Sequence, residues 1–352
     1  MFESLGFETL TAPQAAVWLG LVLGLAFGAL AEVTRFCLRR AVVGPIGERR
    51  SAAAVWLTAL ATAVIGTQAA VLSGVIDFSD HRFFAADLPV LAIVAGGLLF
   101  GAGMVLTRGC VSRLTVLSAS GNLRAIFVLL VFAITAHATL KGVLAPLRTT
   151  LGSVTLPLGE AASLATLPFG SALLPAVIVV LALAVALKSG ARPLHLALAA
   201  LLGLLVPAGW VGTGFVLYDD FDPVALQSLS FTAPAADTLF WTIASTSIPA
   251  NFGTGLIGGT LAGAAILALI SGRFQWQSFE GSAQTGRYAL GASMMGVGGV
   301  LAGGCTVGAG LAGVPTLSAA ALLALAAIVG GGYGMGRALE PRGQTPTAMP
   351  AE

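Results

Sequence analysis

Residues 100–110 read FGAGMVLTRGC, an apolar helix pattern that runs into glycine and closes on a cysteine. Two further segments align with this one without gaps, FGALAEVTRFC at 27–37 and MGVGGVLAGGC at 295–305. Each copy lies where an apolar run ends, and the segment after it is too short to cross a bilayer again. We therefore expect three broken or re-entrant helices, because glycine lets the backbone bend at such points.

The composition around these segments is typical of a membrane protein. Of 352 residues, 57% are hydrophobic and only 9% are charged, whereas roughly 25% are charged in an average soluble domain. The net charge of +2 is small and the basic residues are scattered, which argues against nucleic-acid binding. Three cysteines are too few for a disulfide framework. No residue grouping has the spacing of a closed metal site or of a phosphate loop. We expect no cofactor and no ATP-hydrolysing machinery.

The apolar runs predict about nine transmembrane helices, since roughly 20 helical residues cross the bilayer core. The run at 238–272 is too long for one crossing and holds a helix breaker at 248–253, so we expect a half-membrane helix followed by a full one. The run at 288–336 is long enough for two crossings. The other runs are 13–31, 51–76, 88–107, 125–140, 161–187 and 193–218. The predicted fold class is an all-α polytopic membrane protein with short re-entrant helices, surrounded by membrane lipid.

Basic residues in the short loops predict the orientation, because cytoplasmic loops are enriched in Lys and Arg. Alternate loops and the last segment are basic: Arg39, Arg40, Arg49, Arg50, Lys188, Arg192, Arg273, Arg287, Arg337 and Arg342. Of the remaining loops, one carries Asp77, Asp80, Arg82 and Asp87, and another carries Asp219, Asp220 and Asp222 with no basic residue. We expect a periplasmic N-terminus and a cytoplasmic C-terminus in a bacterial inner membrane. Lys141 and Arg148 go against this pattern.

The three cysteines are the candidate functional residues. A lone cysteine in a membrane helix is usually a small apolar filler, but unrelated fillers would not all close the same motif. Thiols are weak donors, and several weak sites in series favour conduction of an anion. Arg35 and Arg108 precede two of the cysteines by two residues and either bind that anion or extend to the interface. Arg35 could also pair with Glu32. Helix starts at Gly308–Gly310 and Asn251–Gly255 are further candidates.

At these residues the chain resembles the YeeE/YedE family of bacterial sulfur-transport membrane proteins. The resemblance rests on GMVLTRGCVSRLTVLSASGNLRAIFVLLVFAITAHATLKG (103–142) and MGVGGVLAGGCTVGAGLAG (295–313), with WVGTGF (210–215), FDP (221–223) and SLSFTAP (228–234) between them. It implies one transport domain over 1–352 with two pseudo-symmetric halves, approximately 13–150 and 168–337. It also implies a thiosulfate-like substrate relayed along cysteines.

Carried over residue by residue, the resemblance makes Cys110 the central thiol, Cys305 the periplasmic station and Cys37 the cytoplasmic one. The neighbouring substrate-binding candidates are Arg35, Arg108, Gly109, Gly304, Thr306 and Gly308. Relatives often carry a polar residue where this chain has Ala309, and other branches have a Gly-His turn after the central cysteine. The substrate is therefore open among thiosulfate, sulfite and a selenium analogue. A cytoplasmic sulfur-carrier or sulfurtransferase partner would fit the family.

Two other functions remain open from the sequence. A membrane protein that exchanges disulfides or persulfide sulfur would need paired cysteines, and Cys-x-x-Cys is absent. An exporter of sulfite-like anions is the other. His137 and Lys141, one helical turn apart, form either an anion or proton relay or a pair at the membrane interface. We expect a transporter rather than an enzyme.

Overall fold

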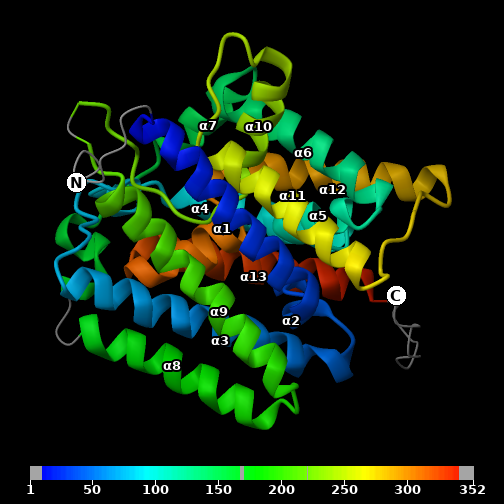
Figure 1. Cartoon of the computed structure of the whole chain (residues 1–352), viewed down its shortest axis with the longest axis horizontal. Coiled ribbons are helices and arrows are strands. Elements are labelled where there is room, and N and C mark those ends of the chain that lie inside the picture. Colours follow the sequence, from blue (N-terminus) through cyan, green and yellow to red (C-terminus); the bar gives the residue numbers. More distant parts are fainter. Residues whose placement is uncertain (1–9, 167–169, 220, 341–352) are drawn as a thin grey trace.

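The computed structural model describes residues 10–166, 170–219 and 221–340. Within them, nine helices are long and apolar enough to cross a membrane, so the predicted all-α polytopic fold is confirmed. These helices are α1 (Ala12–Thr34), α3 (Ile46–Leu72), α4 (Val90–Leu106), α6 (Leu123–Lys141), α8 (Gly170–Lys188), α9 (Pro193–Val211), α11 (Phe252–Ile270), α12 (Ser282–Leu301) and α13 (Ala319–Leu339). Figure 1 shows them running roughly side by side.

Shorter elements connect the long helices. They are α2 (Leu38–Val43), α5 (Val111–Ala119), α7 (Ala145–Gly152), α10 (Thr232–Ala244), the π-helices η5 (Gly212–Val216) and η6 (Thr306–Gly313), and the 3-10 turns η2 (Arg82–Phe84), η3 (Gly159–Ala162), η4 (Leu164–Thr166) and η7 (Val314–Thr316). Strands β1 (Asp87–Leu88) and β2 (Leu156–Pro157) pair antiparallel, with Asp87 opposite Pro157. Three of the short helices, α2, α5 and η6, directly follow the three cysteine segments.

The breaker inside 238–272 divides that run as expected. Helix α10 ends at Ala244 and the full-length α11 begins at Phe252, with the Asn251 side chain accepting a hydrogen bond from the Thr254 N–H at 2.9 Å. The predicted span at 161–187 begins too early, because α8 starts at Gly170 and residues 161–166 form 3-10 turns. Residues 161–166, which precede α8, are uncharged although they are not part of that helix. The start of an uncharged run therefore does not mark the start of a helix.

Helices α1 and α11 pack through two matching rows of glycine. A Cβ added to Gly20, Gly24 or Gly28 would lie within 3.0 Å of α11 backbone atoms, and a Cβ on Gly255, Gly259 or Gly263 would meet the α1 backbone in the same way. Without a hydrophobic driving force between helices in lipid, such close backbone approach is what holds them together. The glycine spacings thus serve helix packing, and they bring α1, with its cysteine turn, against α11.

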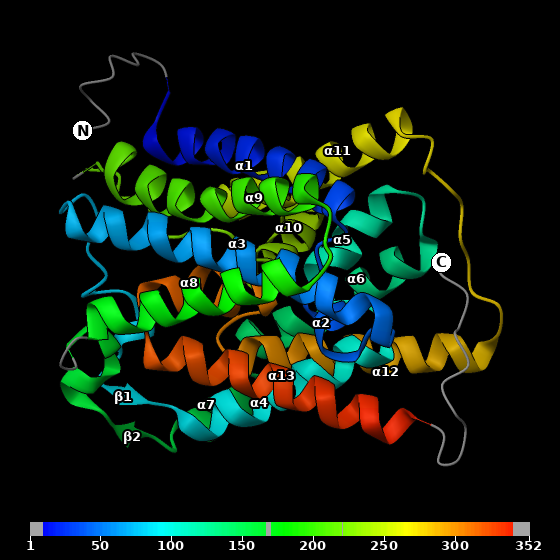
Figure 2. The ribbon, with the colours of Figure 1, turned by 90° about the horizontal axis from the view of Figure 1, so that it is seen from below.

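The two described ends of the chain lie at opposite ends of the helix bundle (Figures 1 and 2), which an odd number of crossings requires. Helix α8 lies at the edge of the bundle and only Ala182 in it is buried, as expected for a lipid-facing helix. Which end faces the cytoplasm stays a prediction, and so do the two pseudo-symmetric halves. The N-terminal residues 1–9, Asp220 and Arg342 lie outside the described residues.

Replacing Gly259 by valine is expected to destabilise the protein, because the side chain would press on the α1 backbone. Overpacking of this kind costs about 3 kcal/mol at the upper end of its range. The matched control is Gly334→Val in α13, where an added Cβ meets no atom within 4 Å. Thermal unfolding in detergent should show a lower midpoint for Gly259→Val alone. Equal midpoints for the two variants would contradict the packing described.

Candidate functional site

Each cysteine segment contains the same backbone turn. The residue two positions before the cysteine adopts the left-handed conformation in all three copies, with φ of 51° at Arg35, 60° at Arg108 and 74° at Gly303. This conformation is unfavourable for residues other than glycine, and it ends the preceding helix abruptly. The repeat seen in the sequence is therefore a repeat of backbone geometry.

Threonine stabilises the turn in the first two copies. The Thr34 hydroxyl donates to the Leu30 carbonyl at 2.7 Å, and the Thr107 hydroxyl lies 3.0 Å from the carbonyl oxygens of both Gly103 and Gly109. Both hydroxyls thus bond back one turn into the helix that ends, and Thr107 also joins that helix to the carbonyl after the turn. Gly109 thus has a structural role here, through its carbonyl.

The three thiols each precede the first turn of a short helix. Cys37 caps α2, Cys110 caps α5 and Cys305 caps η6. The Gly308 N–H donates to the Cys305 sulfur at 3.4 Å. Backbone N–H groups at a helix start attract negative charge. The cysteines therefore lie at the ends of helices that favour an anion.

The three thiols are buried, and those of Cys37 and Cys110 lie side by side. The exposed fractions are 4% for Cys37, 1% for Cys110 and 0% for Cys305, and all three cysteines are free. The Cys37 thiol lies beside the Cys110 thiol, and the Cys110 sulfur is 3.3 Å from the Ser112 hydroxyl. The hydroxyl of Thr306, the residue after Cys305, also lies beside the Cys110 thiol, as a hydrogen-bonding neighbour. The fold thus brings Cys37 and Cys110 together and places Thr306, at the start of η6, beside Cys110.

The two candidate arginines do not share this burial. Arg35 and Arg108 are both exposed, whereas the cysteines that follow them are buried. Glu32 does not pair with Arg35, because its carboxylate is 3.3 Å from Arg113 and 3.8 Å from Arg273. The basic groups near the Cys37 thiol are Arg113 and Arg39.

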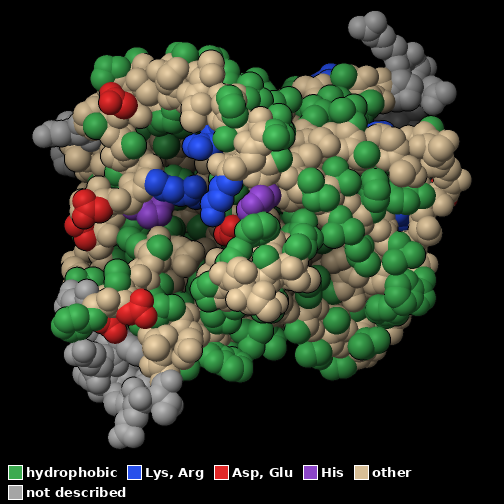
Figure 3. Space-filling view, turned by 90° about the horizontal axis from the view of Figure 1, so that it is seen from above, with side chains coloured by type: hydrophobic (Ala, Val, Ile, Leu, Met, Phe, Trp, Pro, Cys, Tyr) green, Lys and Arg blue, Asp and Glu red, His purple; other side chains and the backbone are tan. Residues whose placement is uncertain are grey.

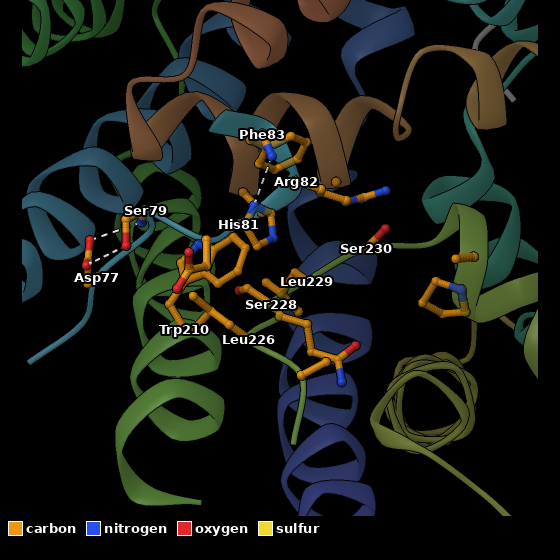
Figure 4. A pocket seen from close by; sticks show the side chains of 17 residues that line it. Asp77, Ser79, His81, Arg82, Phe83, Trp210, Leu226, Ser228, Leu229 and Ser230 are labelled. Atoms are coloured by element: carbon orange, nitrogen blue, oxygen red, sulfur yellow. Dashed lines mark hydrogen bonds between the residues drawn. The ribbon is translucent and has the colours of Figure 1, made fainter. Parts of the chain in front are cut away.

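A cavity of about 600 Å³ reaches the Cys305 segment from one end of the bundle. Its walls come from residues 77–83, from Trp210 at the end of α9, from residues 225–230 and from the start of α10 (Figure 4). Gly308 and Ala312 of η6 form part of the lining. A Cβ at Gly308 would lie 2.7 Å from the Ser230 hydroxyl oxygen, so glycine is needed there.

Gly304 and Thr306 shape the start of η6, next to the cavity wall. A Cβ at Gly304 would lie 2.7 Å from the Ala309 backbone nitrogen, so glycine lets η6 fold tightly on the cysteine. The Thr306 hydroxyl is buried and faces the Cys110 thiol, so it links η6 to the second cysteine.

Arg82 is the basic side chain of the cavity. One guanidinium nitrogen donates to the Gly303 carbonyl at 3.0 Å, and the guanidinium lies over the Phe83 ring at 5.1 Å. Among the described residues it forms no ion pair with a carboxylate. Asp77, which also lines the cavity, is held by the N–H and hydroxyl of Ser79. Arg82 thus links the cavity to the backbone turn at Gly303. Its other guanidinium N–H groups remain available to bind an anion.

His81 is neutral at ordinary pH. Burial, together with the neighbouring Arg82, lowers the pKa of His81 to about 4, and its Nδ1 accepts a hydrogen bond from the Phe83 N–H at 3.3 Å. The ring lies between Phe83 and Trp210, with centroid distances of 4.8 Å and 5.3 Å. His81 therefore positions the η2 turn that carries Arg82. Seen from above, Lys, Arg and His side chains gather around a hollow (Figure 3).

His137 and Lys141 of α6, the polar pair noted in the sequence, lie next to α10. His137 stacks on Phe240 with ring centroids 4.6 Å apart, and its buried Nδ1 has no partner among the described residues. Asp237 of α10 lies close enough to His137 and Lys141 to act on both electrostatically. His137 and Lys141 are thus part of a packed contact between α6 and α10. This contact is compatible with both a relay and a pair at the membrane interface.

Arg82, His81 and Ser230 were not selected from the sequence as site residues. They lie in loops, and no spacing rule links a loop at 77–83 to a segment at 225–230. The available signal was the stretch SLSFTAP at 228–234, which contributed to the family resemblance and supplies Ser228 and Ser230 of the cavity wall.

Comparison with known proteins agrees with this geometry. A family profile described as sulphur transport matches residues 33–334. The chain belongs to this sulphur-transport family. It is 24% identical over 339 residues to "Thiosulfate transporter TsuA" of Spirochaeta thermophila (strain ATCC 700085 / DSM 6578 / Z-1203), which covers 88% of this chain and 94% of the relative. The protein of the same name from Escherichia coli (strain K12) is 24% identical over 320 residues, covering 83% and 86%.

Gly303 gives a direct test of the turn in this sulphur-transport family member. Gly303→Val is expected to lower stability by about 1–2 kcal/mol or more, because a β-branched residue resists the left-handed conformation. Gly303→Asn should lose much less. An added Cβ meets no atom within 4 Å, so the difference reports the backbone alone. Thermal unfolding of both variants measures it, and equal losses would contradict the assigned conformation.

His81 predicts a pH dependence of stability. Its pKa in the folded protein is about 4, below the ordinary value of roughly 6.5 for an unfolded chain. The unfolded state therefore binds more protons between these values, and stability falls as the pH drops from 6.5 toward 4. In His81→Gln that fall should be shallower. Unfolding midpoints of both proteins at pH 7.5, 5.5 and 4.5 test this, and parallel curves would contradict it.

Proposed function

We propose that this protein takes up thiosulfate, or a similar small sulfur oxyanion, across the inner membrane. The anion passes Cys305, then Cys110, then Cys37, without forming a covalent bond. One observation carries the proposal: the buried thiols of Cys37 and Cys110 lie side by side, Thr306 next to Cys305 lies beside Cys110, and η6 lines a cavity whose basic side chain is Arg82. The names of the two TsuA relatives support thiosulfate as the anion.

The cavity is the proposed point of capture. Arg82 offers a guanidinium that carries no carboxylate partner in the described structure, and the Ser228 and Ser230 hydroxyls lie in the same wall. A dianion that leaves water needs donors in place of its hydration shell. The cavity supplies them beside Gly308, whose N–H already contacts the Cys305 sulfur.

The thiols are suited to passage because they bind weakly. A thiol is a poor hydrogen-bond donor with a polarizable sulfur, so a terminal sulfur on the substrate would be held only lightly. Weak, successive sites allow an ion to leave as well as arrive. Cys305 is fully buried, so passage requires η6 to move. Its three glycines between residues 306 and 313 leave the backbone free to move.

The direction of transport follows from the predicted orientation. With the N-terminus in the periplasm, the cavity opens outward and Cys37, beside α2, lies toward the cytoplasm. A sulfur-carrier or sulfurtransferase protein there is the proposed partner. In this account the protein performs no chemistry on the anion.

The adjacent thiols of Cys37 and Cys110 favour a second candidate function. Sequence spacing offers no cysteine pair, but the fold brings these two side by side. A membrane thiol-exchange protein would use them to reduce a disulfide substrate to two thiols while forming one disulfide between them. Mass spectrometry of protein recovered during turnover distinguishes the two. A Cys37–Cys110 disulfide or a persulfide favours exchange, and unmodified thiols favour passage.

Growth on thiosulfate tests the proposal. In a bacterial strain that lacks other sulfur uptake, Cys110→Ala and Cys305→Ala should each reduce thiosulfate-dependent growth at least about tenfold, since each removes one contact in the series. Ser293→Ala, which removes one polar atom from α12 away from the cysteine turn, is the control. Full growth of Cys110→Ala at equal protein levels would contradict the relay.

A further inference from the structure

We propose that Arg39 and Arg113 form an anion-binding station beside Cys37, and that Glu32 occupies Arg113 when the station is empty. This inference rests on the proposed transport function and adds to it a binding site at the end of the cysteine series opposite the cavity. In Figures 1 and 2, α2, α5 and the segment that follows α11 lie at the same end of the bundle.

The station is built on a buried cluster of charges. Glu32 of α1 is 5% exposed. One of its carboxylate oxygens is 3.3 Å from Arg113 of α5, and the other is 3.8 Å from Arg273, which follows α11. Three elements far apart in the sequence therefore converge on one carboxylate. Buried charge of this kind needs compensation, because its hydration has been lost.

Arg39 adds a positive charge without a partner. Its Nε is buried and has no hydrogen-bond partner among the described residues. Arg39 and Arg113 both act electrostatically on the Cys37 thiol. Arg40, the next residue, is engaged by Glu48 at 2.6 Å. The guanidinium groups left to face the Cys37 thiol are thus those of Arg39 and Arg113.

The cluster carries an excess of positive charge. Arg39, Arg113 and Arg273 contribute three positive charges against the one negative charge of Glu32, and Arg108 also acts electrostatically on Arg39. A doubly charged sulfur oxyanion would offset more of this excess than a single chloride.

The Glu32–Arg113 contact is long for a pair meant to be permanent. Charge-assisted contacts are typically about 2.7–2.9 Å and are often bidentate, whereas this pair is joined by one contact of 3.3 Å. Arg113 lies three residues after Cys110 on α5, and Glu32 lies five residues before Cys37. An anion moving from Cys110 to Cys37 passes this pair and competes with Glu32 for Arg113. When the carboxylate returns to Arg113, the anion is released.

Binding of ³⁵S-thiosulfate to the purified full-length protein in detergent, measured by equilibrium dialysis, tests the station. Arg39→Gln should weaken binding about tenfold, the effect of losing one hydrogen-bonded charge. Glu32→Gln should strengthen binding, because a neutral amide competes poorly for Arg113. Arg39→Lys, which keeps the charge, should fall between parent and Arg39→Gln. Arg192→Gln, a basic residue outside the cluster, is the control.

The same variants in proteoliposomes separate this inference from the proposed function. Glu32→Gln is expected to take up thiosulfate more slowly than the parent, because release is slowed. If the parent transports thiosulfate while Arg39→Gln and Glu32→Gln bind and transport it as the parent does, the station is wrong and the proposed function stands. A parent that binds through Arg39 but takes up none overturns the function and supports the station. A parent that does neither overturns both.

Discussion

A helix that stops inside a membrane must satisfy its own backbone, because lipid offers no hydrogen bonds. This constraint governs the structure at three places. At Arg35, Arg108 and Gly303 the chain turns through a left-handed residue, threonine hydroxyls take up carbonyl groups in two of the copies, and a cysteine begins the next short helix. The thiols therefore lie at helix starts, where free N–H groups favour an anion.

The packing of the long helices fixes where these turns meet. Glycine rows let α1 and α11 approach backbone to backbone, which brings Glu32 of α1 within reach of Arg273. The short helices α2, α5 and η6 bring the Cys37 and Cys110 thiols and the hydroxyl of Thr306 together, with a cavity lined by η6 and a basic cluster around Glu32. Positive charge at both ends and weak donors between them is an arrangement suited to an anion that must enter and leave.

Much of this arrangement can be predicted from the sequence, because it depends on short stretches of neighbouring residues. The cysteine repeat, the nine crossings and the break before Asn251 depend on residues next to one another in the chain. What the sequence does not reveal depends on contacts between distant segments or on the direction of a side chain. Arg35 and Arg108 are exposed although the cysteines two residues later are buried. Glu32 pairs with Arg113, 81 residues away, and Arg82 reaches Gly303, 221 residues away.

The most direct test of the cysteine series is an experimental structure with a thiosulfate analogue whose terminal sulfur is replaced by selenium. Anomalous scattering then locates the selenium atom without ambiguity. The account predicts selenium peaks in contact with the sulfur atoms of Cys305, Cys110 and Cys37, at partial occupancy and without covalent bonds. Peaks confined to the outer cavity, or along a route that avoids all three thiols, would contradict it.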